Sequence, residues 1–154
     1  MDELDIVDEA LIDADRATVY AAVGDLARGK AQWWPGVQIR PRGEIGPDLV
    51  GGVVDMVVRR LPGATSTLRI VEVREDEMVR NEYIDGPILG VGTLTLTPVD
   101  GKTRASYRWQ IRPHARLLRL FVRLVPRMHR RFMRTYFEGL RGYVERERPA
   151  PTGP

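Results

Sequence analysis

The chain has 154 residues, the length of one domain with one core, and its 43% hydrophobic content is ordinary for a globular protein. It contains no cysteine, which excludes disulfides and cysteine-ligated metals, and no apolar run approaches the roughly 20 residues that span a bilayer. The net charge of +3 conceals an asymmetry: residues 1–100 carry 10 basic and 18 acidic side chains, whereas residues 101–154 carry 14 basic and 3 acidic ones.

The N-terminal segment is predicted to combine a strand with short helices. Its acidic start, MDELDIVDEA, is unlike a secretory signal, so we expect a cytoplasmic protein. Residues 4–12 are predicted to form the first strand. An aspartate that follows, at position 13 or 15, can cap a short helix that Gly24 ends, and a second short helix is predicted over residues 25–30.

Residues 37–112 follow a β pattern rich in Val, Ile, Leu and Thr. We predict six strands, over residues 37–42, 51–60, 65–75, 78–85, 89–97 and 103–112. The breaks between them are short and turn-like, which indicates consecutive antiparallel hairpins. Alternation in the last strand places one aromatic-rich set of side chains on a single face. We expect this set to point inward together with Leu94 and Leu96, and it consists of Ala105, Tyr107, Trp109 and Ile111.

The chain ends in an amphipathic helical pattern. Residues 114–125 and 127–147 have helical periodicity, and Pro126 predicts a bend between them. The apolar side is predicted to hold Leu118, Phe121, Val125, Met128, His129, Phe132, Tyr136, Leu140 and Tyr143, and the basic side Arg119, Arg123, Arg127, Arg130, Arg134 and Arg141. Gly139 lies toward the apolar side and is expected to let the helix approach a bulky residue of the sheet closely. A bent sheet has an open concave face that one long helix can cover.

This order of elements, with its local motifs, resembles the START-related helix-grip superfamily (SRPBCC, which includes the birch pollen allergen fold), and most of all its polyketide cyclase/dehydrase branch. The motifs are IDADRATVYAAVGD, QWWPGVQ, LVGGVV, LTLTPVDGKTRASYRW and FEGLRGYVERE. The resemblance spans about residues 4–147. It implies an α+β helix-grip fold: a curved antiparallel sheet of about seven strands wrapped around a long C-terminal helix, with two short helices after the first strand. It also predicts one domain over residues 1–148 and a flexible tail over residues 149–154.

The resemblance further implies an apolar cavity between sheet and helix that binds a small hydrophobic or amphipathic ligand, lipid-like or polyketide-like. On this basis we expect a carrier or sensor. The alternative is a cyclase/dehydratase-type enzyme that uses polar residues of the cavity, without a metal, and no cofactor is predicted. The predicted ligand-binding residues are Trp34, Tyr83, Tyr107, Trp109, Val125, Met128, His129, Phe132 and Tyr136.

Two residues are candidates for catalysis. His129 is the only histidine on the apolar side of the helix and could act as an acid or base, or could be a core histidine satisfied by one hydrogen bond. No histidine or carboxylate stands at helical ligand spacing from it, so no metal site is predicted. Asp55 would be buried if its face of the strand points inward. A cross-strand pair with Arg69 would then satisfy both charges, and an ordinary surface pair is the alternative.

The basic side of the helix has more than one interpretation. A solvated surface over a packed core is the simplest. Weak contact with an anionic membrane through Arg119, Arg123 and Arg127 is the alternative, and it would make the protein a peripheral lipid-transfer module. Leu120 and Leu124 support this alternative because they lie nearer the basic side. Nucleic acid is not an expected partner, because no binding motif accompanies the arginines.

The oligomeric state is predicted only as monomer or homodimer. If Leu68 and Ile70 pointed outward, they would form an apolar strip on the sheet that could pair with a second copy.

Overall fold

A curved sheet, two long helices and one short helix make up the described part of the chain, residues 3–61, 64–114, 116–120 and 122–147 of the computed structural model. The elements in chain order are β1 (Leu4–Ile12), α1 (Arg16–Ala27), β2 (Val37–Pro41), β3 (Val53–Val58), β4 (Thr65–Arg74), β5 (Met78–Asp85), β6 (Ile88–Val99), β7 (Lys102–Pro113), α2 (Arg116–Leu120) and α3 (Val125–Glu147). The seven strands form one antiparallel sheet with the order β1-β7-β6-β5-β4-β3-β2. The predicted tail over residues 149–154 lies outside the described residues.

The predicted helix-grip sheet is confirmed, and the strand ends differ from the predicted ones by two residues or fewer. The aromatic-rich face of β7 points inward, since Tyr107 and Trp109 are buried while Arg108 between them is exposed. Leu68 and Ile70 of β4 are buried on the same concave side. The apolar strip that they would have formed for pairing with a second copy is therefore absent, and that interpretation is wrong.

A single helix, α1, follows β1 where two short helices were predicted. Asp15 caps it, because the Thr18 amide donates to the Asp15 carboxylate at 2.8 Å. Gly24 does not end the helix but is buried within it. The stop signal is Gly29, which adopts φ +73° one residue beyond the C-cap and whose amide donates to the Leu26 carbonyl. A glycine inside a helical pattern was thus mistaken for a glycine at its end.

The C-terminal helical segment is interrupted before Pro126 rather than at it. A turn over residues 122–124 separates α2 from α3. Pro126 is the second residue of α3. Amides in the first turn of a helix have no acceptor within the helix, so proline, which lacks the amide hydrogen, costs no hydrogen bond there. Of the predicted apolar side, Phe121 and the side chain of Leu118 lie outside the described residues.

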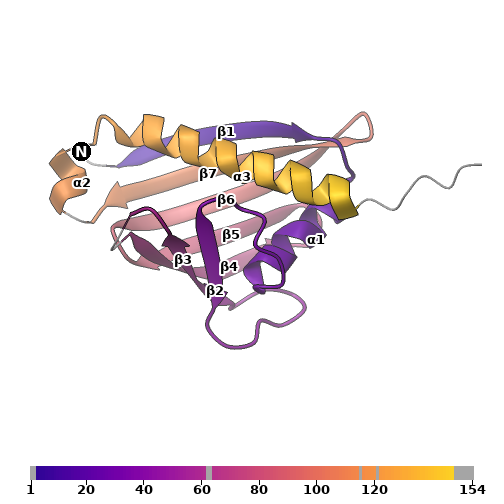
Figure 1. Cartoon of the computed structure of the whole chain (residues 1–154), viewed down its shortest axis with the longest axis horizontal. Helices are drawn as coiled ribbons and strands as arrows, with labels where there is room; N and C mark the ends of the chain where they lie inside the picture. The colour runs from indigo at the N-terminus through magenta and orange to yellow at the C-terminus, as the bar shows by residue number, and fades with distance from the viewer. Residues whose placement is uncertain (1–2, 62–63, 115, 121, 148–154) are drawn as a thin grey trace, which may run out of the picture.

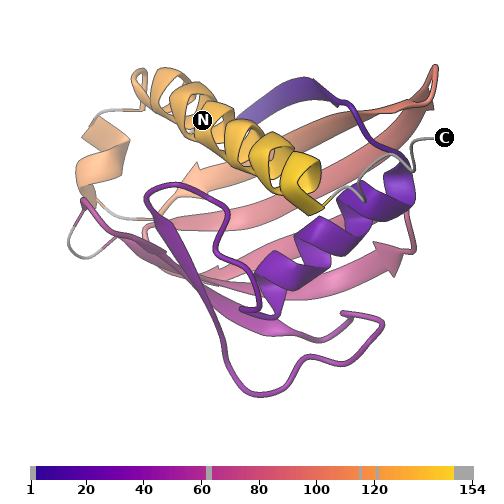
Figure 2. The ribbon, with the colours of Figure 1, turned by 45° about the vertical axis from the view of Figure 1, so that its right-hand side comes forward.

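The two long helices lie side by side on the concave face of the sheet, with α3 running along it and α1 next to its C-terminal half (Figures 1 and 2). The Tyr143 hydroxyl of α3 donates to Asp25 of α1 at 2.9 Å. Gly139 permits a close approach, as predicted, but its partner is a loop. A Cβ built at this position would lie 2.0 Å from the Trp33 carbonyl oxygen, in the segment between α1 and β2. The loop that carries Trp33 and Trp34 therefore packs closely against α3.

Candidate ligand-binding site

An apolar cavity of about 250 Å³ lies between the concave face of the sheet and the first half of α3. Strands β2 to β7 form its floor and walls, α3 forms its roof, and α1 closes one side. Its volume is slightly below the range of roughly 300–1,000 Å³ that is common for drug-sized ligands, so it suits a molecule of one or two rings.

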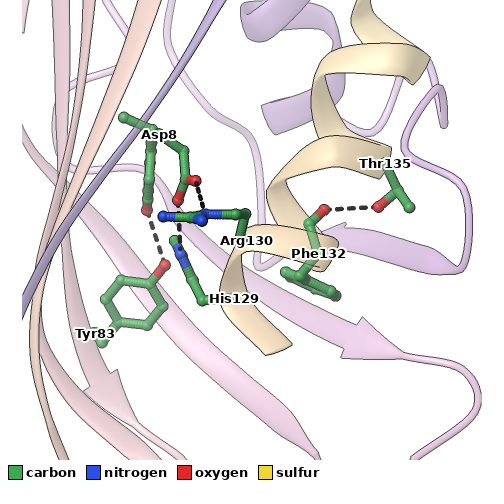
Figure 3. Close-up of polar contacts among 7 residues, drawn as sticks. Asp8, Tyr83, His129, Arg130, Phe132 and Thr135 are labelled. Carbon is green, nitrogen blue, oxygen red and sulfur yellow. Dashed lines mark hydrogen bonds and ion pairs between the residues drawn. The ribbon is translucent and has the colours of Figure 1, made fainter. Parts of the chain in front are cut away.

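Aromatic side chains from the loop and from α3 form one wall of the cavity. The ring of Trp34 lies 4.8 Å from that of Phe132 and 4.9 Å from that of Tyr136, measured between centroids. The Trp34 indole nitrogen donates to the Thr135 hydroxyl at 3.1 Å, and this hydroxyl donates to the Phe132 carbonyl at 2.7 Å (Figure 3 shows the second bond). Edge-to-face packing and this hydrogen bond hold the Trp34 ring in one orientation.

A small polar cluster interrupts the apolar floor. The hydroxyls of Tyr83 on β5 and Tyr107 on β7 are hydrogen-bonded at 2.8 Å across the intervening strand β6. The bond is possible because Gly92 of β6 has no side chain, and a Cβ there would lie 2.0 Å from the Tyr107 hydroxyl. The indole nitrogen of Trp109 is buried and has no hydrogen-bond partner in the described part of the chain. It lies close enough to the Tyr83 hydroxyl to lower the pKa of that residue, although the geometry is not that of a hydrogen bond.

The tyrosines of this cluster are neutral hydrogen-bond donors at physiological pH. Burial raises the pKa of Tyr83 above its usual 10, partly offset by the Tyr107 hydroxyl. Burial together with the neighbouring Tyr83 raises the pKa of Tyr107 well above 10. Burial has the same effect on the pKa of Tyr136, which lines the same cavity. The cluster can therefore donate hydrogen bonds to a ligand oxygen but is not a source of negative charge.

His129 of α3 is paired with a carboxylate that comes from the edge of the sheet. Its Nδ1 lies 3.1 Å from Oδ2 of Asp8 on β1, and the side chains are only 5% and 11% exposed. The Nε of Arg130 lies 4.0 Å from the other carboxylate oxygen of Asp8. The His129 ring also stacks on Trp109, with a centroid separation of 3.7 Å and an angle of 9° between the planes. Figure 3 shows Asp8, His129 and Arg130 converging between β1 and α3.

His129 is a neutral imidazole at pH 7. Burial lowers its pKa from 6.5 to about 4, against the opposing effect of the Asp8 carboxylate. A carboxylate oxygen accepts hydrogen bonds, so Nδ1 carries the proton and donates a hydrogen bond to Asp8. Nε2 then keeps its lone pair and can accept a proton or a hydrogen bond. Because His129 belongs to the cavity lining, the pair gives the apolar cavity one basic group.

All nine residues predicted to bind a ligand line the cavity. Their role in binding stays a prediction. Met128 differs from the other eight because it is exposed, at 52%, whereas Phe132 is partly buried and the remaining seven are buried. It lies at the rim of the cavity, where α3 begins.

Asp55 does not face the cavity, so the inward pair with Arg69 is wrong and the alternative, an ordinary surface pair, holds with Arg42 as the partner. Arg69 lies opposite Val53 in the sheet, whereas Asp55 lies opposite Thr67. The Asp55 carboxylate accepts from Arg42 Nε at 2.9 Å and from the Thr67 hydroxyl at 2.7 Å. The neighbouring Val54 and Met56 occupy the cavity side of β3, so Asp55 lies on the convex face and cannot take part in chemistry inside the cavity.

The polar residues near the cavity that the sequence analysis did not predict include Asp8 and Asn81. Asp8 shares the inward face of β1 with Leu4, Ile6, Ala10 and Ile12. Asn81 lies between Val79 and Tyr83 on the inward face of β5 and lines the cavity. In both cases a polar residue occupies a position at which the period-two alternation predicts an apolar one. This interruption of the pattern could have identified both residues as candidates.

Among the described residues, no group of three or more histidine or acidic side chains could hold a metal ion. None of the described helices is long and apolar enough to cross a membrane.

Comparisons with known proteins connect this geometry to a family. Among solved structures, the chain is similar to the ZhuI aromatase/cyclase from Streptomyces sp. R1128 (16% identity, TM-score 0.73, covering 99% of each chain). It is also similar to a START superfamily protein from Mycobacterium smegmatis (12%, TM-score 0.73, 92% of this chain and 97% of that one). A third is norcoclaurine synthase from Thalictrum flavum in complex with dopamine and hydroxybenzaldehyde (13%, TM-score 0.71, 96% and 90%).

At these identities the structures show a shared fold alone, the START-like helix-grip fold. No protein with a curated description matches the sequence. The family model described as "Polyketide cyclase / dehydrase and lipid transport" matches residues 3–145, nearly the whole chain. The protein therefore belongs to the polyketide cyclase/dehydrase and lipid transport family.

Proposed function

We propose that the protein binds a small, mostly apolar ring compound in its cavity, as a carrier or sensor. The observation that supports this most directly is the buried Trp109 indole nitrogen, which lacks a hydrogen-bond partner in the described part of the chain. A buried donor left unpaired costs about 1–3 kcal/mol, so a ligand acceptor that reaches it would recover this free energy. The tyrosine hydroxyl pair next to it offers one further donor, because one of its two hydrogens is used in the bond between them.

The ligand class follows from the lining. Most of the wall is aliphatic or aromatic, which favours a hydrophobic body of one or two rings. The polar cluster favours a single carbonyl or hydroxyl oxygen at the inner end of that body. Two of the similar structures agree with this class, since one is described as an aromatase/cyclase and another holds dopamine and hydroxybenzaldehyde.

The proposal can be tested with 2-naphthol and naphthalene as probes, which differ by one hydroxyl. We expect both to bind, with 2-naphthol favoured about fivefold because one neutral hydrogen bond is worth roughly 1 kcal/mol. Trp109→Phe removes the free indole donor and should reduce the preference. Trp33→Phe is the matched control, because the Trp33 nitrogen already donates to the Ala22 carbonyl at 2.9 Å and does not line the cavity. If titration calorimetry finds no binding of either probe, the proposal fails.

A second candidate function, proton transfer on a bound carbonyl compound, is favoured by the Asp8–His129 pair. Nε2 of His129 would take a proton from the carbon next to the carbonyl. Tyr83 or Tyr107 would donate a hydrogen bond to the oxygen, on which negative charge develops. Asp8 would orient the imidazole and stabilise the imidazolium that forms, as a carboxylate does in hydrolase triads.

This candidate is tested by the exchange of the α-protons of 2-tetralone for deuterium, followed by NMR in D₂O. The protein should accelerate the exchange above the buffer rate, and His129→Gln should remove the acceleration. Asp55→Asn, which alters a carboxylate on the convex face, is the control and should exchange like the unaltered protein. Exchange at the buffer rate despite binding of the ketone would leave only the carrier function.

A further inference from the structure

The rim of the cavity carries large apolar side chains that point into solvent. Leu120 of α2 is 77% exposed, Leu124 in the turn after it 48%, and Met128 of α3 52%, and these three follow one another at intervals of four residues. Leu61 in the loop between β3 and β4 is 51% exposed. Exposed apolar side chains scattered singly are normal, but four at one end of the molecule indicate an interaction surface.

These side chains are close in the chain to residues that line one end of the cavity. Met128 and Val125 line the cavity at the start of α3, and Val58 and Ala64 line it at the two ends of the β3–β4 loop that carries Leu61. In both ribbon views α2 lies at the same end of the molecule as the end of β3 and the start of β4 (Figures 1 and 2). Residues 116–120 and 122–128, together with Arg59, Arg60 and Leu61, therefore border this end of the cavity, and we call them the rim.

The rim is strongly basic. Arg116, Arg119, Arg123 and Arg127 are exposed among the leucines, and Arg59 and Arg60 are exposed beside Leu61. The sequence has no acidic residue between Asp100 and Glu138. Two exposed acidic residues also lie at this end, Asp85 in the turn between β5 and β6 and Glu3 just before β1, and they do not balance the six arginines. Exposed leucines interspersed with arginines are the composition of segments that lie at the surface of an anionic bilayer.

We propose that the rim docks on a membrane that contains anionic lipids. Leu120, Leu124 and Met128 would enter the headgroup region, and the arginines beside them would bind lipid phosphates. The mouth of the cavity would then face the bilayer, where apolar compounds accumulate. Docking itself needs no ligand in the cavity, so this proposal and the proposed ligand binding can fail separately.

Charge argues against a second copy of the chain as the occupant of this surface. In a twofold-symmetric dimer the same patch would lie on both sides of the interface, so the arginines of one copy would face those of the other. An anionic bilayer offers the opposite charge, together with an apolar layer beneath it for the leucines. The rim therefore fits a bilayer in both its charge and its apolar side chains.

The test is flotation of the protein with vesicles of phosphatidylglycerol and phosphatidylcholine, compared with pure phosphatidylcholine. We expect binding only to the anionic vesicles and its loss between ionic strengths of about 0.05 M and 0.5 M. Arg119→Gln/Arg123→Gln should weaken the partition coefficient about thirtyfold, from the usual contribution of an arginine near an anionic surface. Leu120→Ser/Leu124→Ser should weaken it at least tenfold while leaving the charge unchanged.

The matched control is Arg69→Gln/Arg74→Gln, which removes the same charge from exposed positions of β4, away from the rim. This variant should bind like the unaltered protein. The proposal is overturned if the protein does not float with anionic vesicles at low salt, or if the control loses as much affinity as the rim variants. It is also overturned if light scattering shows a dimer that the leucine variant dissociates. The altered side chains are all exposed, so thermal unfolding should confirm that every variant folds.

Discussion

Replacing Gly139 by alanine tests how tightly α3 is held against the loop that carries Trp33 and Trp34. The added Cβ would lie 2.0 Å from the Trp33 carbonyl oxygen, 2.8 Å from Pro35 Cδ and 3.0 Å from the Trp33 carbonyl carbon. Two of these three atoms belong to the backbone, which cannot rotate away as a side chain can. Either α3 or the loop must move, and Trp34, the next residue of the loop, forms a wall of the cavity.

The net effect is the difference between two opposing contributions. Alanine favours a helix over glycine by about 1 kcal/mol. Overpacking of a tight contact usually costs about 1–3 kcal/mol, and a backbone contact this short belongs at the upper end. We therefore expect Gly139→Ala to lower the free energy of unfolding by about 1–2 kcal/mol. For a domain of this size that corresponds to a Tm lower by roughly 2–8 °C.

Gly142 of the same helix provides the matched control. A Cβ there would meet only the end of the Arg146 side chain, at 3.2 Å, which can move aside. Gly142→Ala should therefore raise the free energy of unfolding by about 1 kcal/mol through helix propensity alone. Urea denaturation of both variants measures the two changes, which should have opposite signs. If Gly139→Ala were as stable as Gly142→Ala, the close approach of α3 to the loop would be refuted.

Three further predictions concern polar groups in and around the cavity. The free energy of unfolding should fall as the pH drops from about 6.5 toward 4, because His129, with its pKa lowered to about 4, stays neutral in the folded state while the unfolded chain takes up a proton. The loss at pH 5 is on the order of 2 kcal/mol. Urea titrations at pH 7 and 5 measure this loss, which should be absent in His129→Gln. Asp55→Asn should cost less than about 1 kcal/mol and leave the affinity for 2-naphthol unchanged, and a tenfold loss of affinity would contradict its place on the convex face. Tyr107→Phe leaves the Tyr83 hydroxyl without its partner and should destabilise by about 1–3 kcal/mol. Because the two hydroxyls share one bond, the double variant with Tyr83→Phe should lose less than the sum of the single variants.

The fold could be predicted from the sequence because its strands alternate in period two and their connections are short. Both properties are local, and they leave few arrangements other than consecutive antiparallel hairpins. The errors arose where local patterns are ambiguous. Gly24 is compatible with a helix end or a helix interior, and only the positive φ of Gly29 decides between them. Pro126 is compatible with a kink or with a first turn, and the start of α3 decides.

The cavity lining could be predicted to a similar extent, but the pairings inside the site could not. The helical and strand periodicities place Trp109 and His129 on inward faces, which is enough to assign them to the lining. The partner of each group depends on which strands are neighbours and in which register. A cross-strand pair of Asp55 with Arg69 would need a register that differs from the observed one by two residues, and the sequence does not decide between the two registers.

The Asp8–His129 pair illustrates the limit most clearly, because its members are separated by 121 residues. They meet only because β1 pairs with β7, the last strand, so that α3 packs between the sheet edge and the cavity. A carboxylate at an inward position of an edge strand is costly unless a partner reaches it, and the helix that crosses the concave face is the nearest source of one. The single inward acid of β1 and the single inward histidine of α3 are therefore each other's natural partners once the strand order is known. The same reasoning from an unpaired group applies to Trp109, whose donor has no partner in the described part of the chain and for which a ligand oxygen is the acceptor that we propose.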